Sequence, residues 1–173
     1  SYTEFEQKMG ELEEKDGQIS VDVEVTNTGD VAGKDVVEVY YKPPYTNGGI
    51  EKSSANLIEF AKTDLLQPGE SQTVTVTFSI EDMASYDENN AKAYILEKGD
   101  YVISINSDSH TVLDQKTYTA DKDVVYKGEN KRASDDTAAT NVFEDAKGDV
   151  TYLSRADHFA NYEEATAAPA SAE

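Results

Sequence analysis

His110 and His158 are the two histidines of this 173-residue chain, and they are the first place to look for acid–base or metal chemistry. A metal site built on histidine needs several ligands that converge on one point. Counting residues leaves a Ser-His-Asp arrangement open, but the sequence has no G-x-S-x-G motif. His110 falls at the end of an expected strand, where a surface or hydrogen-bonded role is typical. The histidines therefore predict no catalytic centre.

Carboxylates are abundant, with 35 acidic against 15 basic residues and a formal net charge of −20. Glycosidases work with paired carboxylates, but most of these side chains fall on expected solvent faces or in turns. A calcium loop is the other acidic candidate, and Asp121 with Asp123 comes nearest to one, without the glycine and the distal glutamate that such a loop needs. We therefore interpret the charge as a contribution to solubility. We predict no catalytic residue and no metal.

The composition also excludes several classes of partner and cofactor. A strongly negative field repels nucleic-acid phosphates and anionic membranes, and no apolar stretch approaches the roughly 18 residues that span a bilayer. The sequence has no cysteine, so it offers neither disulfides nor thiol catalysis. Gly48-Gly49 resembles no nucleotide fingerprint. We expect no cofactor, while the cellular compartment stays open. The first residues do not resemble a signal peptide and look like the middle of a longer chain.

An aromatic cluster brackets a proline pair and is the one candidate binding feature. Its residues are Tyr40, Tyr41, Pro43, Pro44 and Tyr45. An exposed tyrosine ring can stack on the C–H face of a sugar while its hydroxyl stays hydrated. Alternatively, the segment is a rigid loop that packs on its own domain or on a neighbouring one, which is the interpretation we favour. Tyr40, Tyr45, Pro43 and Pro44 are the candidate interface or sugar-stacking residues.

Hydrophobic alternation with a period of two predicts that residues 1–120 are all-β. Ile19, Val21, Val23 and Val25 alternate with polar residues, and Val74, Val76 and Phe78 do the same. This pattern places one face of each strand in a core and the other in water. The other expected strands cover residues 35–42, 57–61, 93–96, 101–105 and 112–119, with one helical turn near 81–86. Seven or eight short strands of this kind predict an antiparallel sandwich, with a closed barrel as the alternative.

The character of the chain changes near residue 121. Residues 127–140 are polar and without periodicity, which is typical of a linker, and residues 165–173 are rich in Ala, Thr, Pro and Ser. Phe143, Tyr152 and Leu153 belong to apolar clusters that are too sparse for a second core. We therefore expect a sandwich over residues 1–120, followed over 121–173 by an acidic, largely irregular tail that is partly disordered or drapes over the sandwich.

Several segments resemble, in order, the fibronectin type III-like domain of family 3 glycoside hydrolases of the β-glucosidase type. The most specific is VTNTGDVAGKDVVEVY, residues 25–40; LIEFAKT, LLQPGE, MASYD and GDYVISI follow at the expected spacing. The first of these motifs makes physical sense, since Asn27-Thr28-Gly29 permits a tight turn with positive φ and Gly33 lets the chain re-enter the sheet. Pro68-Gly69 presets a second turn.

The resemblance implies a fibronectin type III/immunoglobulin-like sandwich with an accessory role. In this family the sugar chemistry belongs to a barrel that supplies an aspartate nucleophile and to an α/β domain that usually supplies the acid/base. Because neither domain is in the sequence, no catalytic residue is carried over, and Asp157 is not taken for the nucleophile. Residues 148–157 resemble the connector of members with reversed domain order, in which the barrel comes last. The implied partners are those two domains, together with homodimer contacts.

Three functions are therefore compared. The first is a structural module that holds the catalytic domains of a parent enzyme in place. The second is a carbohydrate-binding module that uses the tyrosines around Pro43-Pro44. The third is an adhesin-type immunoglobulin-like domain, which shares the fold and predicts neighbouring repeats in the gene instead of a barrel. We favour the first.

Overall fold

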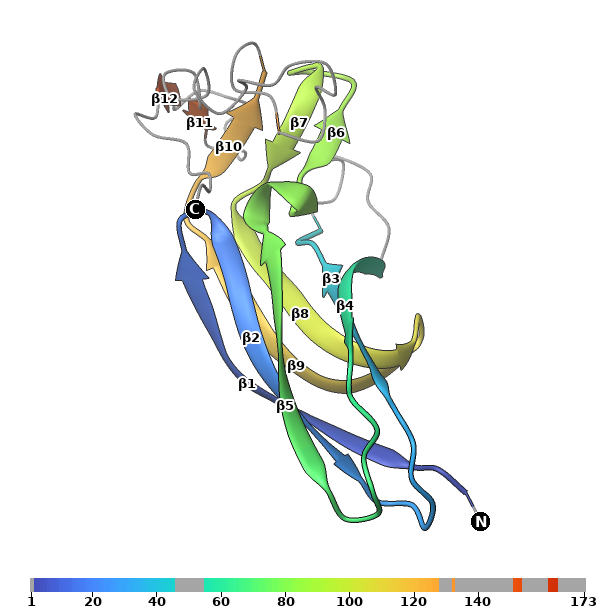
Figure 1. Ribbon diagram of the computed structural model, residues 1–173. Coiled ribbons are helices and arrows are strands. Elements are labelled where there is room, and N and C mark those ends of the chain that lie inside the picture. Colours follow the sequence, from blue (N-terminus) through green and yellow to red (C-terminus); the bar gives the residue numbers. More distant parts are fainter. Residues whose placement is uncertain (1, 46–54, 128–131, 133–150, 154–161, 165–173) are drawn as a thin grey trace, which may run out of the picture.

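The alternating valines of the sequence form the middle strand of a three-stranded antiparallel sheet. The computed structural model describes residues 2–45, 55–127, 132, 151–153 and 162–164. The sheet has the order β1-β2-β5 (Figure 1), with β1 at Phe5–Lys15, β2 at Gln18–Asn27 and β5 at Ser71–Ser79. On β2 every second side chain is buried, and Val23 and Val25 are 0% exposed. The predicted alternation is confirmed.

A four-stranded antiparallel sheet covers the other side of the core. Its order is β4-β3-β8-β9, with β4 at Asn56–Lys62, β3 at Val36–Lys42, β8 at Gly99–Asp108 and β9 at Thr111–Ala120. Val37, Ile103 and Ile105 point inward from this sheet and are fully buried against the valines of β2. Two facing sheets with one dry layer between them make a sandwich, so the predicted fold class is confirmed and the barrel alternative is wrong.

A third, smaller sheet lies beyond the end of the sandwich that is opposite the N-terminus (Figure 1). Its order is β12-β11-β10-β7-β6, with β6 at Ser85–Asp87, β7 at Ala93–Leu96, β10 at Asp123–Tyr126, β11 at Thr151–Leu153 and β12 at Tyr162–Glu164. The helical turn predicted near 81–86 is a 3₁₀ helix, η1, at Ile80–Met83, and β6 follows it. The connection between β5 and β8 therefore leaves the sandwich to supply two strands of this sheet.

Pairing continues past residue 120, because β10 pairs with both β7 and β11. The division into 1–120 and 121–173 stays a prediction. The structure places Tyr152 and Leu153 in β11, at the level of the backbone. The expectations for Phe143, Asp157, His158 and the segment 165–173 lie outside the described residues.

Gly29 is needed for a close approach of two segments and not for a left-handed turn. Among the described glycines, φ is positive only at Gly17, Gly69 and Gly99, so the expectation of positive φ in the Asn-Thr-Gly turn is wrong for Gly29. A Cβ atom there would lie 2.5 Å from the Tyr2 carbonyl oxygen and 2.7 Å from the Glu4 nitrogen. The N-terminal segment thus runs directly against this turn. The Pro68-Gly69 turn has φ of +85° at Gly69 and a hydrogen bond from the Glu70 nitrogen to the Gln67 oxygen, as predicted.

Replacing Gly29 with alanine should lower the free energy of unfolding by about 1–3 kcal/mol, since the backbone in contact must shift to admit a methyl group. Urea unfolding measures this. Gly10→Ala is the matched control, because its Cβ would meet the Asp22 carbonyl oxygen at 3.4 Å, an ordinary contact. Equal stabilities for the two variants would contradict the close-approach interpretation.

Candidate functional site

The tyrosines around Pro43-Pro44 do not form one platform. Tyr40 is only 9% exposed, and its hydroxyl donates a hydrogen bond to Glu38 Oε1 at 3.2 Å. Burial and the Glu38 carboxylate both raise the pKa of Tyr40. Tyr41 points the other way and packs on the edge of the core. Tyr45 is 77% exposed. Sugar stacking at this segment stays a prediction, with Tyr45 as the ring that is open to solvent.

The proline pair is fixed against the start of β8. Pro43 is buried, and a Cβ atom at Gly99 would lie 2.9 Å from the Cβ atom of Pro44. Gly99 also has φ of +135°, a conformation that side chains rarely adopt. The Pro43-Pro44 segment therefore packs on its own domain, and its role towards a neighbouring domain stays a prediction.

Among the described residues, His110 and the pair Asp121 and Asp123 lie at opposite ends of β9. His110 is exposed in the turn between β8 and β9, where its backbone nitrogen donates to Asp108 Oδ1 at 2.8 Å. Hydrogen bonds from the turn lower the pKa of Asp108. Asp121 is exposed, whereas Asp123 is fully buried. In the described part of the chain, no three His, Cys, Asp or Glu side chains are grouped so that they could hold a metal ion.

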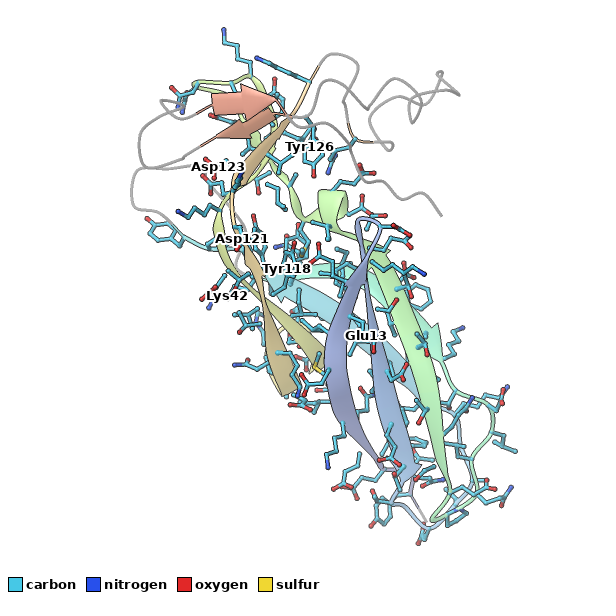
Figure 2. The ribbon with its side chains drawn as sticks, turned by 90° about the vertical axis from the view of Figure 1, so that its left-hand side faces the viewer. Glu13, Lys42, Tyr118, Asp121, Asp123 and Tyr126 are labelled. Atoms are coloured by element: carbon cyan, nitrogen blue, oxygen red, sulfur yellow. The ribbon has the colours of Figure 1, made fainter. Side chains whose placement is uncertain are left out.

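A tyrosine corner joins the sandwich to the small sheet. Tyr101, at 1% exposure, donates its hydroxyl to the backbone oxygen of Glu97 at 2.8 Å, which is the contact that many immunoglobulin-like sandwiches make at the entrance to this strand. Asp123 Oδ1 accepts the backbone N–H of Lys98 at 2.6 Å. Figure 2 shows how the chain rises from Tyr118 through Asp123 to Tyr126 at this junction. These buried polar groups fix the position of β10.

A row of three tyrosines crosses the small sheet and was not foreseen from the sequence. Tyr86 pairs with Tyr94, and Tyr94 pairs with Tyr126, on adjacent strands. The Tyr86 and Tyr94 rings meet edge to face with their centroids 5.3 Å apart. The Arg132 guanidinium lies 3.6 Å from the centroid of the Tyr94 ring, a cation–π contact. Arg132 therefore covers the middle ring of this row.

The two outer faces of the sandwich differ in chemistry. On the three-stranded sheet, the outward side chains of β2 and β5 are Ser20, Asp22, Glu24, Thr26, Thr73, Thr75 and Thr77. Several bond to one another across the strands; Thr75 Oγ1, for example, donates to Asp22 Oδ1 at 2.6 Å. No large apolar side chain stands out from these two strands. Such a face is typical of one that stays in water.

On the four-stranded sheet, the outer face exposes large apolar side chains. We call this outer face of β4-β3-β8-β9 the apolar face. Its exposed members are Val36 at 38%, Leu57 at 52%, Phe60 at 54% and Val112 at 50%. Their cross-strand partners place them on the outward side of the sheet. An alternating strand normally points such residues inward, so this face is the strongest candidate for an interaction site.

The helices of the described residues include none that is long and apolar enough to cross a membrane. The apolar face belongs to strands of the sandwich, and its side chains are interspersed with Glu38 and Ser104. Large exposed apolar groups among polar ones are typical of a surface that contacts another protein.

Comparisons with known proteins agree with this architecture. Residues 35–109, from just before β3 to the end of β8, match the fibronectin type III-like domain family. A β-glucosidase of Kluyveromyces marxianus is 33% identical over 129 residues, which are 74% of this chain and 15% of that protein. Beta-glucosidase A of Butyrivibrio fibrisolvens is 42% identical over 111 residues, 62% of this chain and 13% of that protein.

Solved structures give the same result. The crystal structure of the Kluyveromyces marxianus β-glucosidase in complex with glucose superimposes with a TM-score of 0.66 and 30% identity, covering 73% of this chain and 15% of that one. β-Glucosidase 3B of Thermotoga neapolitana, also with glucose, gives a TM-score of 0.62 and 31% identity, covering 70% and 16%. This chain thus spans a small part of the proteins it matches. It contains a fibronectin type III-like domain that is homologous to one segment of β-glucosidases of glycoside hydrolase family 3.

Proposed function

We propose that this chain is a non-catalytic module of a family 3 β-glucosidase-type enzyme, and that it packs against the catalytic domains and holds them in position. The observation that supports this most directly is that a sandwich with its own dry core matches only 15% of a β-glucosidase. A unit of that size within a much longer chain is a domain of its own. The parent enzyme, on this proposal, hydrolyses O-glycosyl bonds elsewhere in its chain.

A rigid sandwich is suited to such a positioning role. Side chains in a close-packed core occupy fixed rotamers and transmit strain instead of absorbing it. The tyrosine corner and the hydrogen bond from the Lys98 backbone N–H to Asp123 Oδ1 tie the small sheet to this body. The segment that follows β10 would then leave from a fixed point, towards a barrel if the parent has the reversed domain order. Homodimer contacts of the parent are a further part of the proposal.

The chain by itself should release no detectable nitrophenol from an aryl β-glucoside, whereas the complete parent enzyme should be active. Deleting residues 1–127 from the parent should lower its melting temperature and its kcat/KM, because the catalytic domains lose a packed neighbour. The matched control is the parent with only residues 165–173 removed. Robust hydrolysis by the pure chain, surviving repeated purification, would refute the proposal.

A further inference from the structure

We propose that the apolar face is the surface through which this module docks, and that its occupant is a surface of the same parent polypeptide outside residues 1–173. That surface is apolar and presents an arginine or lysine opposite Glu38. The inference rests on the proposed function and adds to it the face, the contact residues and the chemistry of the partner. The residues that make the contact are Val36, Leu57, Phe60 and Val112.

Strand register places these side chains in one patch. Phe60 stands beside Glu38, Glu38 beside Asn106, and Asn106 beside Val112, in one row across the four strands. In the next row, Leu57 stands beside Tyr40. Directly opposite side chains lie about 5 Å apart. The exposed apolar groups of β4 and β9 therefore flank a central strip from β3 and β8.

The central strip is already dry and internally bonded. Tyr40, Ser104 and Asn106 are 9%, 6% and 3% exposed although they lie on the outer face of the sheet. Ser104 Oγ donates to Asn106 Oδ1 at 2.6 Å, and the Tyr40 hydroxyl donates to Glu38. Polar groups that are bonded to each other can be covered by a partner without losing hydrogen bonds to water. Covering Ser104 and Asn106 consequently carries little desolvation cost, whereas the charged Glu38 carboxylate needs a basic partner to offset its own.

Charge favours a basic neighbour over a second copy of the chain. Glu38 lies opposite Phe60 and accepts the Tyr40 hydroxyl, while Lys62, opposite Val36, and Lys42, opposite Val102, lie towards the two ends of β3 on the same face. The chain as a whole carries a formal charge of −20. A twofold dimer through the same patch would bring two such charged molecules together with like patches facing. An arginine or lysine of the parent would instead pair with Glu38 while its apolar surroundings cover Phe60 and Leu57.

The relatives show how much polypeptide is available to provide this surface. The matched segment is 15% of the Kluyveromyces marxianus β-glucosidase and 13% of the Butyrivibrio fibrisolvens enzyme. The remaining length of such a parent is covalently linked to the module, so docking is intramolecular. A linked partner acts at a high effective concentration, and a modest apolar patch is then enough for stable packing.

Single-cysteine labelling of the complete parent enzyme tests the proposal, because the module has no cysteine of its own. Leu57→Cys and Phe60→Cys probe the face, and Leu65→Cys is the matched control, since Leu65 is 54% exposed like Phe60 but lies in a connecting segment. Thr73→Cys probes the opposite face. Maleimide labelling is followed by mass spectrometry of the peptides, with rates in urea as the unfolded reference and melting curves to confirm folding.

In the native parent, the two face positions should be labelled at least about tenfold more slowly than Leu65→Cys, which corresponds to 1.4 kcal/mol of docking free energy.

Fast labelling at Leu57 and Phe60 with protection at Thr73 would overturn this face while leaving the proposed function intact. Fast labelling at every position would refute both the docking face and the proposed function if deletion of the module also left the melting temperature and kcat/KM of the parent unchanged. Protection that depends on protein concentration would assign the face to a second copy. Protection only with added cellobiose would assign it to sugar. Either result would overturn the proposal.

Discussion

Replacing Asn27 with alanine will lower the free energy of unfolding by about 3–5 kcal/mol, a large part of the 5–15 kcal/mol that is typical of a domain. Asn27 is 0% exposed. Its amide nitrogen donates to the carbonyl oxygens of Val31 and Leu66 at 2.9 Å each, and its Oδ1 accepts the Gly29 N–H at 2.9 Å. Alanine leaves all three backbone groups without this partner. Urea unfolding followed by far-UV circular dichroism measures the loss.

The bonds of Asn27 also explain why the effect is large for one side chain. Val31 and Leu66 belong to two different connecting segments, and Gly33 pairs with Leu66 by backbone bonds in both directions. Asn27 therefore ties the end of β2 to the connection between β2 and β3 and to the connection between β4 and β5. The Leu66 oxygen still accepts from the Gly33 N–H and the Gly29 N–H still donates to the Glu4 oxygen, so the loss is that of three hydrogen bonds of about 1 kcal/mol each together with the cavity that the amide leaves.

Two further variants test that explanation. Asn27→Asp keeps the shape but can only accept hydrogen bonds at neutral pH, so its loss should be at least as large as that of Asn27→Ala. Asn90→Ala removes an exposed amide side chain and should change the free energy of unfolding by less than about 0.5 kcal/mol. A neutral effect of Asn27→Asp would show that packing, and not donation to Val31 and Leu66, is what Asn27 contributes.

The interior of the sandwich could be predicted from the sequence because β2 and β5 alternate without interruption. β1 could not, since its inward residues Met9 and Leu12 are separated by a register shift, which breaks the period of two, and its remaining residues are mostly charged. The strand is identified only through its pairing with β2. The buried face of a strand can therefore be predicted where the period of two is unbroken. It cannot be predicted where a bulge changes which side chains point inward.

The same limitation applies to the candidate site. Tyr40 lies in the expected strand over residues 35–42 and on its outward side, yet it is only 9% exposed, which alternation does not predict. The register shift lies in β4, where Ile58 has no partner on β3, so that Leu57 and Phe60 come to the same face. Leu57 and Phe60 lie in an expected strand, but their spacing of three does not show which of them faces the core. A signal for the tyrosine corner was present, however, in Tyr101, a tyrosine near the start of an expected strand.

Raising the pH above 10 will destabilise the fold, and Tyr101→Phe will remove part of that dependence. Burial first, and then the nearby Glu97, raise the pKa of Tyr101 above its ordinary value of 10.0. In the unfolded chain the phenol loses its proton near pH 10, whereas in the folded chain it keeps it. The folded state therefore binds more protons above pH 10, and stability falls as the pH rises, by up to about 1.4 kcal/mol per pH unit for this group.

The free energies of unfolding of Tyr101→Phe and of the wild type should converge and then cross as the pH rises. At pH 8, Tyr101→Phe lacks the hydrogen bond to the Glu97 oxygen and should be less stable by about 1 kcal/mol. Between pH 10 and pH 11.5 the wild type loses about 2 kcal/mol through this residue, and the variant does not. Near pH 11.5 the two proteins should therefore be equally stable, or their order should reverse, in urea unfolding at each pH.

Other tyrosines set the background of this measurement. Burial also raises the pKa of Tyr40 and of Tyr41, so the free energy of unfolding of both proteins will still fall to some extent above pH 10. Tyr2→Phe, at a residue that is 55% exposed, is the control and should follow the wild-type curve. A constant stability gap between wild type and Tyr101→Phe from pH 8 to pH 11.5 would show that the corner hydroxyl ionises equally in both states. The corner would then be open to water, and it could not hold the small sheet in place as the positioning role requires.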